Sequence, residues 1–206
     1  MTAEDAQTFA RCMRVHGVAV FPADTVYGLA CEPNAPEAVE RLYRLKGRSR
    51  GKPAAVMFFD RELALAALPE LGERTRAALL ALLPDALTVL LPNPAARFAL
   101  AGGSDPTTLG LRVPKLSGDL GPLADVRWPV LQSSANRAGG PDPRRVEDVP
   151  DELRRGVDLV LDGGELPGTP STVIDLRDYE ERGTWSVVRD GAVPAAELAR
   201  RLDQAG

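Results

Sequence analysis

The sequence predicts an α/β fold, a twisted mixed sheet with packed helices. Apolar runs of strand length alternate along the chain with stretches whose apolar residues recur at helical spacing. Apolar residues make up 44% of the 206 residues and charged residues 26%, which is enough apolar material for a substantial core. No internal repeat and no linker divides the sequence, so residues 1–206 are expected to form a single domain.

The order of the expected elements follows from these patterns and from the prolines and glycines between them. Short apolar runs predict strands at 17–22, 54–59, 86–91, 107–113, 129–133, 157–161, 172–176 and 184–189. Helical spacing predicts helices at 3–16, 61–68, 73–83, 117–125 and 151–155, and a last helix opened by Pro194. The segment 23–33 is expected to be a loop.

A further helix is expected after that loop. Asn34 is suited to cap it, and Pro36 lies near its first turn, where proline is tolerated. Gly47 suits the left-handed position that ends such helices. Lys46 and Arg48 are therefore expected at the helix terminus and in the loop that follows it.

Two long loops are candidates for function. Residues 93–106 have the length at which a loop without secondary structure is usually functional or disordered. Residues 135–145, ANRAGGPDPRR, have the composition of a mobile lid or binding loop. We expect this second loop to close over a bound ligand.

Several classes of protein are excluded by composition. No apolar run approaches the ~20 residues that cross a bilayer, and the N-terminus lacks the apolar segment of a secretory signal, so a cytoplasmic protein is expected. Cys12, Cys31 and His16 are too few for a four-ligand zinc site of the usual kind. With one histidine, placed at the end of the first helix, a Ser-His-Asp or Cys-His hydrolase is also disfavoured.

The charge distribution points to a local anion site. The net charge of −4 argues against a surface wholly adapted to nucleic acid. Residues 41–52, RLYRLKGRSRGK, nevertheless contain six cations and no anion. A run of charge is often only a solvated face, but Gly47, Gly51 and Pro53 favour a structured turn.

The cations are placed where they could hold a polyphosphate. Lys46, Arg48 and Lys52 flank tight turns and could converge on one anion. Arg112 and Arg189 stand at the ends of predicted strands, where arginine can bind a carboxylate or phosphate through two parallel hydrogen bonds. Transfer reactions of nucleoside triphosphates are helped mainly by positioning and by neutralising this charge.

Polar side chains also gather at predicted strand ends. They are Asp24, Thr25, Tyr27, Ser133, Ser134, Asn136, Ser171 and Thr172. Each has an ordinary turn interpretation, but ligand crevices of α/β sheets lie at such strand ends. No GxxxxGK[ST] loop and no GxGxxG after a strand is present. The residues alone thus predict an anionic, nucleotide-like small molecule and leave the reaction open.

Six motifs in order resemble the YrdC-like threonylcarbamoyl-AMP synthases. They are FPADTVYGLA, LKGRSRGKP, LGLRVP, SSANRAGGPDP, DGG followed by STVID, and VVRDG, between about residues 17 and 191. The resemblance implies a twisted α/β sheet around a positively charged cavity. The chain ends soon after VVRDG, so it resembles the short, single-domain form.

The resemblance also implies an activity. Members of the family join L-threonine, bicarbonate and ATP into L-threonylcarbamoyladenylate and release pyrophosphate. Partner proteins then transfer the threonylcarbamoyl group to an adenosine of certain tRNAs. Magnesium is expected on the phosphates, with no dedicated protein ligand.

Site residues follow from the same resemblance. Lys46 and Arg48 match the catalytic positions. Positions for ATP fall on Arg48, Lys52, Thr108, Ser134, Asn136, Asp142 and Arg189. Positions for threonine fall on Thr25, Arg112, Ser171 and Thr172. The chain departs from the family at Ala23-Asp24, at Ser49 and at Met57, where many members have a histidine on the threonine side.

Two other functions remain open at this point. One is a non-catalytic RNA-binding or ribosome-associated protein that uses the same cationic cavity, against which the net acidity speaks. The other is the carbamoyl-transferring module of hydrogenase-maturation proteins, which normally lies in a much longer chain.

Overall fold

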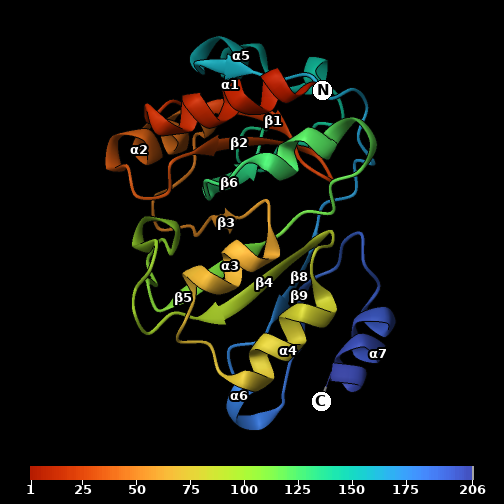
Figure 1. Ribbon diagram of the computed structural model, residues 1–206. Coiled ribbons are helices and arrows are strands. Elements are labelled where there is room, and N and C mark those ends of the chain that lie inside the picture. Colours follow the sequence, from red (N-terminus) through yellow and green to blue (C-terminus); the bar gives the residue numbers. More distant parts are fainter. Residues whose placement is uncertain (206) are drawn as a thin grey trace.

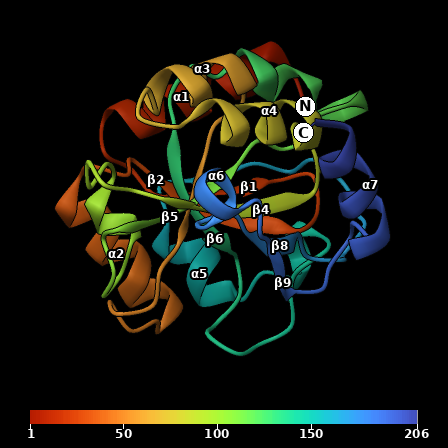
Figure 2. The same cartoon turned by 90° about the horizontal axis from the view of Figure 1, so that it is seen from below.

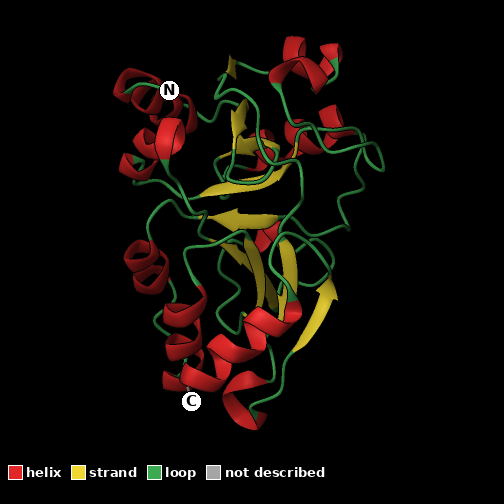
Figure 3. Ribbon diagram, turned by 90° about the vertical axis from the view of Figure 1, so that its right-hand side faces the viewer, coloured by secondary structure: helices red, strands yellow, loops and turns green. Residues whose placement is uncertain are grey.

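A single nine-stranded sheet runs through the computed structural model of the chain, which describes residues 1–205 (Figure 1). The strand order is β7-β1-β2-β6-β3-β5-β4-β8-β9, with parallel and antiparallel neighbours. The strands turn progressively along the sheet (Figure 3). The predicted fold class, a twisted mixed α/β sheet, is confirmed.

The bounds of the elements are close to the predicted ones. The strands are β1 (Ala19–Pro22), β2 (Tyr27–Cys31), β3 (Ala55–Met57), β4 (Leu87–Pro92), β5 (Thr108–Arg112), β6 (Val130–Ser134), β7 (Leu159–Val160), β8 (Thr172–Asp175) and β9 (Ser186–Arg189). The helices are α1 (Ala3–Arg14), α2 (Pro36–Lys46), α3 (Arg61–Ala67), α4 (Glu73–Leu82), α5 (Asp151–Gly156), α6 (Tyr179–Arg182) and α7 (Ala195–Ala205). Short 3-10 helices are η1 (Ala99–Ala101), η2 (Gly118–Asp125) and η3 (Val146–Asp148).

Three local predictions are wrong. The expected loop at 23–33 contains β2, and α6 was not predicted. Asn34 does not cap α2: the N-cap is Ala35, and no side chain caps this end. The Asn34 amide instead donates to Glu32, two residues before it. At the other end Gly47 has φ of 62°, the left-handed C-cap that the sequence predicts.

One face of the sheet, which we call the core face, is covered along its length. Residues paired across neighbouring strands point to the same side. One such row holds apolar residues only, each fully buried: Cys31, Leu131, Val56, Leu111, Val89 and Ile174. This row belongs to the same cluster as Leu42 of α2, Leu79 of α4 and Leu198 of α7. Seen from below, helices lie on both sides of the strands (Figure 2).

The opposite face, which we call the cleft face, is covered by apolar residues at one end only. There Phe9 of α1 packs on Phe21 and Phe59, with ring centroids 5.1 and 5.8 Å apart. Farther along, the row next to the apolar one reads Ala30, Gln132, Ala55, Gly110 and Leu90. Small and polar residues therefore leave room above the middle of the sheet.

Side-chain alternation assigns each residue of β5 to one face. Leu109 and Leu111 are buried in the core, while Thr108, Gly110 and Arg112 lie on the cleft face. None of the helices within residues 1–205 is both long and apolar enough to cross a membrane.

Candidate functional site

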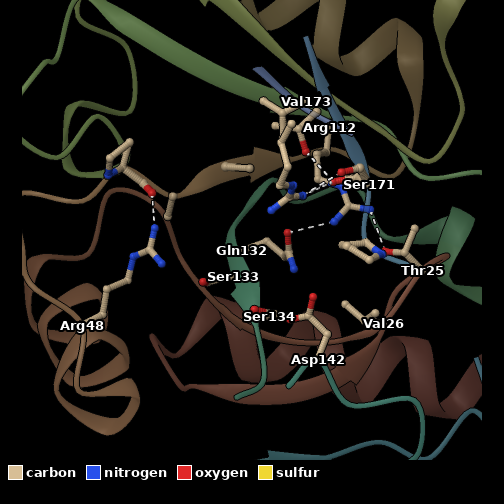
Figure 4. Close-up of a pocket in the computed structure, with 16 residues that line it drawn as sticks. Thr25, Val26, Arg48, Arg112, Gln132, Ser133, Ser134, Asp142, Ser171 and Val173 are labelled. Carbon is tan, nitrogen blue, oxygen red and sulfur yellow. Dashed lines mark hydrogen bonds between the residues drawn. The ribbon is translucent and has the colours of Figure 1, made fainter. Parts of the chain in front are cut away.

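A cavity of about 180 Å³ on the cleft face collects most of the predicted site residues (Figure 4). Those that line it are Thr25, Arg48, Arg112, Ser134, Asp142, Ser171 and Arg189. They come from the β1–β2 connection, the loop after α2, β5, β6 and the loop after it, the residue before β8, and the end of β9.

The cations approach the cavity from different directions. Figure 4 shows Arg48 on one side, Arg112 and Ser171 on the other, and Gln132 between them. Arg48 Nη2 donates to the Pro53 carbonyl at 2.6 Å, which ties this arginine to the loop before β3. Its Nε is buried without a hydrogen-bond partner in the described chain.

Arg112 is held rigidly at the end of β5. It is 4% exposed, and its Nη2 donates to Asp24 at 2.7 Å and to Thr25 Oγ1 at 3.3 Å. Nη1 donates to Gln132 Oε1 at 3.2 Å, whereas the buried Nε has no partner among residues 1–205. Burial raises the pKa of Asp24, and the guanidinium beside it acts in the opposite direction. This clamp presents an oriented donor to a ligand anion.

Arg189 and Ser171 form a second polar group at the same cavity. Arg189 Nη2 donates to the Ser171 carbonyl at 2.7 Å, and Ser171 Oγ lies 2.9 Å from Thr88 Oγ1. The neighbouring Thr172, also a predicted threonine contact, is placed differently. Its hydroxyl donates to the Val193 carbonyl at 2.7 Å and accepts from the Val193 amide at 3.0 Å, outside the cavity lining.

Lys46 lies behind the cavity and is 2% exposed. Its Nζ donates to the carbonyls of Ser134 at 2.6 Å and Asn136 at 2.9 Å, and to Asn136 Oδ1 at 2.5 Å. Burial, followed by the nearby charge of Arg48, lowers the pKa of Lys46 to about 8, and Asp142 acts against this. The ammonium therefore fixes the segment after β6 and is not part of the cavity lining.

Asn136 extends this network into the loop at 135–145. Its Nδ2 donates to the Gly140 carbonyl at 2.6 Å and to Asp142 Oδ1 at 3.1 Å, while its Oδ1 accepts from Ser134 Oγ at 2.8 Å. The Ala138 amide also donates to the Lys46 carbonyl at 3.0 Å. The loop is thus anchored at its first half, and its closure over a ligand stays a prediction.

The two remaining predicted residues lie outside the first cavity. Thr108 lines an adjoining cavity, and its hydroxyl donates to Asp105 at 2.7 Å. Lys52 has an exposed side chain, and its carbonyl accepts a 2.8 Å hydrogen bond from the Tyr43 hydroxyl. Lys52 directly precedes Pro53, which lines both cavities, but Lys52 itself lines neither.

Sequence reasoning overlooked Gln132 and Thr88. Both line the cavity and contact a predicted residue, Arg112 or Ser171. A signal existed for both: Thr88 is a polar residue inside an otherwise apolar strand, and Gln132 stands directly before Ser133 and Ser134. Met57, where many family members have histidine, is fully buried in the cluster beneath α1.

No three His, Cys, Asp or Glu residues between positions 1 and 205 are placed to hold a metal ion together. Asp142 is the carboxylate among the residues lining the first cavity. Cys12 and Cys31 are free thiols, the second one buried.

Comparison with known proteins identifies relatives of similar sequence. "Threonylcarbamoyl-AMP synthase" of Pyrococcus abyssi is 28% identical over 186 residues, which are 89% of this chain and 53% of that protein. The protein of that name from Nitrosococcus oceani is 32% identical over 177 residues, which are 82% of this chain and 91% of that protein. The chain spans about half the length of the P. abyssi and Bacillus subtilis relatives.

Solved structures and a family model agree with these matches. The structure of P. abyssi Sua5 complexed with L-threonine superposes with a TM-score of 0.84 at 25% identity, covering 98% of this chain and 58% of that one. The Sua5/YciO/YrdC family model, described as "Telomere recombination", matches residues 11–191. Because that match spans nearly the whole sequence, the chain belongs to the Sua5/YciO/YrdC family.

Proposed function

We propose that this chain forms L-threonylcarbamoyladenylate and pyrophosphate from L-threonine, bicarbonate and ATP. The observation that carries the proposal is one cavity lined by Arg48, Arg112 and Arg189, with Asp142 as its lining carboxylate. Such a cavity suits anions, and relatives of the chain are named threonylcarbamoyl-AMP synthase. The P. abyssi Sua5 structure is described as complexed with L-threonine, which supports threonine as the amino acid.

The reaction needs positioning more than a strong base. The threonine amine combines with bicarbonate, loses water and gives a carbamate. A carbamate oxygen then bonds to the α-phosphorus of ATP while the bond to pyrophosphate breaks. Because the attacking oxygen is already anionic, the protein must mainly hold two anions together and stabilise the developing charge.

We assign the threonine carboxylate to Arg112. Arg112 lines the cavity, and Asp24 and Gln132 fix the orientation of its guanidinium. Thr25 and Ser171 lie in the same lining and offer hydroxyls to the amino acid. Thr172 is assigned a supporting role, because its hydroxyl is bonded to the Val193 backbone.

We assign the phosphates to Arg48, Arg189 and Ser134, which line the same cavity as Asp142. Lys52 is placed at the edge of this site. Lys46 acts as a positioning residue: it holds the carbonyls of Ser134 and Asn136 and adds positive charge behind the cavity. Magnesium is proposed to enter with ATP as part of the substrate. Asp142 lines the cavity, and its Oδ1 accepts a hydrogen bond from Asn136.

Pyrophosphate release tests the proposal. Purified protein is given ATP and magnesium, and threonine or bicarbonate is omitted in turn. Release that requires both supports the synthase, whose product would pass in the cytoplasm to partner proteins that modify tRNA. Binding of ATP without release under any condition would refute it and would favour the RNA-binding alternative.

A further inference from the structure

A second cavity of about 390 Å³ adjoins the first on the cleft face. The two share the walls Pro53, Ala54, Ala55, Thr88 and Val173. Thr108 lines the second cavity and Arg112 the first, four residues apart on β5, which is about 13 Å at the rise of a strand. One extended molecule can therefore place an anionic part in the first cavity and an uncharged part in the second.

The floor of the second cavity is formed by apolar and mostly small residues. It includes Ala55, Gly110 and Leu90, and Val188, which is 57% exposed, stands at its side. A Cβ on Gly110 would lie 3.6 Å from Ala55 Cα and 3.7 Å from Leu90 Cδ2, which is ordinary contact. The strand does not require glycine there, and the missing side chain leaves room for a flat group. The base of the nucleotide whose phosphates lie in the first cavity fits this description.

Asp105 provides an acceptor at one edge of the cavity. Its Oδ1 accepts from the Thr107 amide at 3.0 Å and the Thr107 hydroxyl at 2.5 Å, and its Oδ2 accepts from Thr108 at 2.7 Å. These hydrogen bonds lower the pKa of Asp105, so the carboxylate is ionised at neutral pH. An ionised carboxylate can only accept hydrogen bonds.

Arg177 places a donor beside this acceptor. Its Nε and Nη2 donate to Asp175, at 3.0 Å and 2.6 Å, and thereby fix the guanidinium. Nη1 is directed to the same Thr108 hydroxyl that Asp105 holds, at 3.4 Å. The second hydrogen on Nη1 can reach a ligand, since each terminal nitrogen of arginine carries two.

We propose that Asp105 and Arg177 make the nucleotide site selective for adenine over guanine, an inference that rests on the proposed use of ATP. Adenine presents an N6 amine, a donor, beside the N7 acceptor, which matches the Asp105 carboxylate beside the Arg177 guanidinium. Guanine presents O6, an acceptor, in place of that amine. Its carbonyl would face an ionised carboxylate, so the guanine nucleotide binds more weakly.

Binding of ATP, GTP and inorganic tripolyphosphate to the full chain tests this selectivity. The wild type is expected to bind ATP about 10- to 100-fold more tightly than GTP, the usual range for one mismatched base contact. In Asp105→Asn the amide can donate to O6 of guanine. The ratio of the affinities for ATP and GTP then falls about tenfold, while the affinity for tripolyphosphate is unchanged. Asp178→Asn, an equal charge change at an exposed residue outside the cavity, keeps the wild-type ratio.

A second variant tests the base site without changing Asp105, whose carboxylate also accepts hydrogen bonds from Thr107 and Thr108. Gly110→Val fills the floor of the cavity and should weaken ATP at least about tenfold while tripolyphosphate still binds. An ATP:GTP ratio unchanged in Asp105→Asn, or a wild type that binds ATP no more tightly than tripolyphosphate, overturns the inference. Selective ATP binding without pyrophosphate release instead refutes the synthase and leaves the base selectivity in place.

Discussion

Replacing Lys46 by methionine should change how stability depends on pH. In the native state burial lowers the pKa of Lys46 from 10.5 to about 8. In the unfolded chain the ammonium keeps its ordinary pKa near 10.4. Between about pH 8 and pH 10.5 the unfolded state therefore binds more protons than the native state. The free energy of unfolding of the wild type should rise with pH in this window, relative to the variant.

The size of the effect follows from the same pKa. Lowering a pKa from 10.5 to about 8 corresponds to about 3 kcal/mol, at 1.36 kcal/mol for each pH unit. Three hydrogen bonds of 2.9 Å or less oppose this cost at pH 7. Their loss leaves buried acceptors of Ser134 and Asn136 unsatisfied, at about 1–3 kcal/mol each. We therefore expect Lys46→Met to be less stable than the wild type at pH 7. The difference in the free energy of unfolding should be larger at pH 10.

Urea unfolding of both proteins at pH 7, 8, 9 and 10 measures the difference. Lys115→Met is the matched control, because Lys115 is exposed and should give a flat difference across these pH values. Other groups that titrate in this range cancel when each variant is subtracted from the wild type. A flat difference for Lys46→Met as well would refute the buried ammonium and its role in holding the segment after β6.

Three substitutions and one proteolysis experiment test other parts of the structure. Arg112→Gln should raise KM for threonine at least about tenfold and cost about 3–5 kcal/mol by leaving Asp24 buried without its partner, as steady-state kinetics and urea unfolding would show. Thr172→Val should lower the free energy of unfolding, measured in urea, by about 1–3 kcal/mol and leave KM for threonine unchanged. A tenfold higher KM would instead support the direct contact with threonine that the sequence predicts. Phe9→Ala should cost about 3–5 kcal/mol in the same assay, because it empties the centre of the cluster beneath α1. Proteolysis of the loop 135–145 should slow with ATP and threonine present, and equal rates would contradict closure.

Most of the fold could be predicted because strands buried on the core face are apolar runs. β2 could not, and the reason is visible in its packing. All five of its residues are buried, so it shows no alternation, and Gly28 suggests a turn. In the structure a Cβ on Gly28 would lie 2.8 Å from Gln132 Nε2. The glycine serves a contact with β6 about a hundred residues later, which no local pattern records.

The candidate site shows a similar division. Arg112 and Ser134 could be predicted because polar residues at the ends of apolar strands stand out. The sequence could not separate Ser171 from Thr172, since only the register of β8 decides that one hydroxyl reaches Thr88 and the other Val193. Nor could it show that Lys46 is engaged by carbonyls 88 and 90 residues away.

The alternation along β5 also limits how its gene can change. Leu109 and Leu111 belong to the core, while the residues on either side of them serve the two cavities. Loss or gain of a single codon within this strand would place the Arg112 side chain in the core and a leucine side chain in the site. Such a protein would lose both its stability and its binding site. A point substitution on the cleft face changes one side chain and leaves Leu109 and Leu111 in the core. Variation in what this protein binds should therefore arise by substitution within a strand of fixed length.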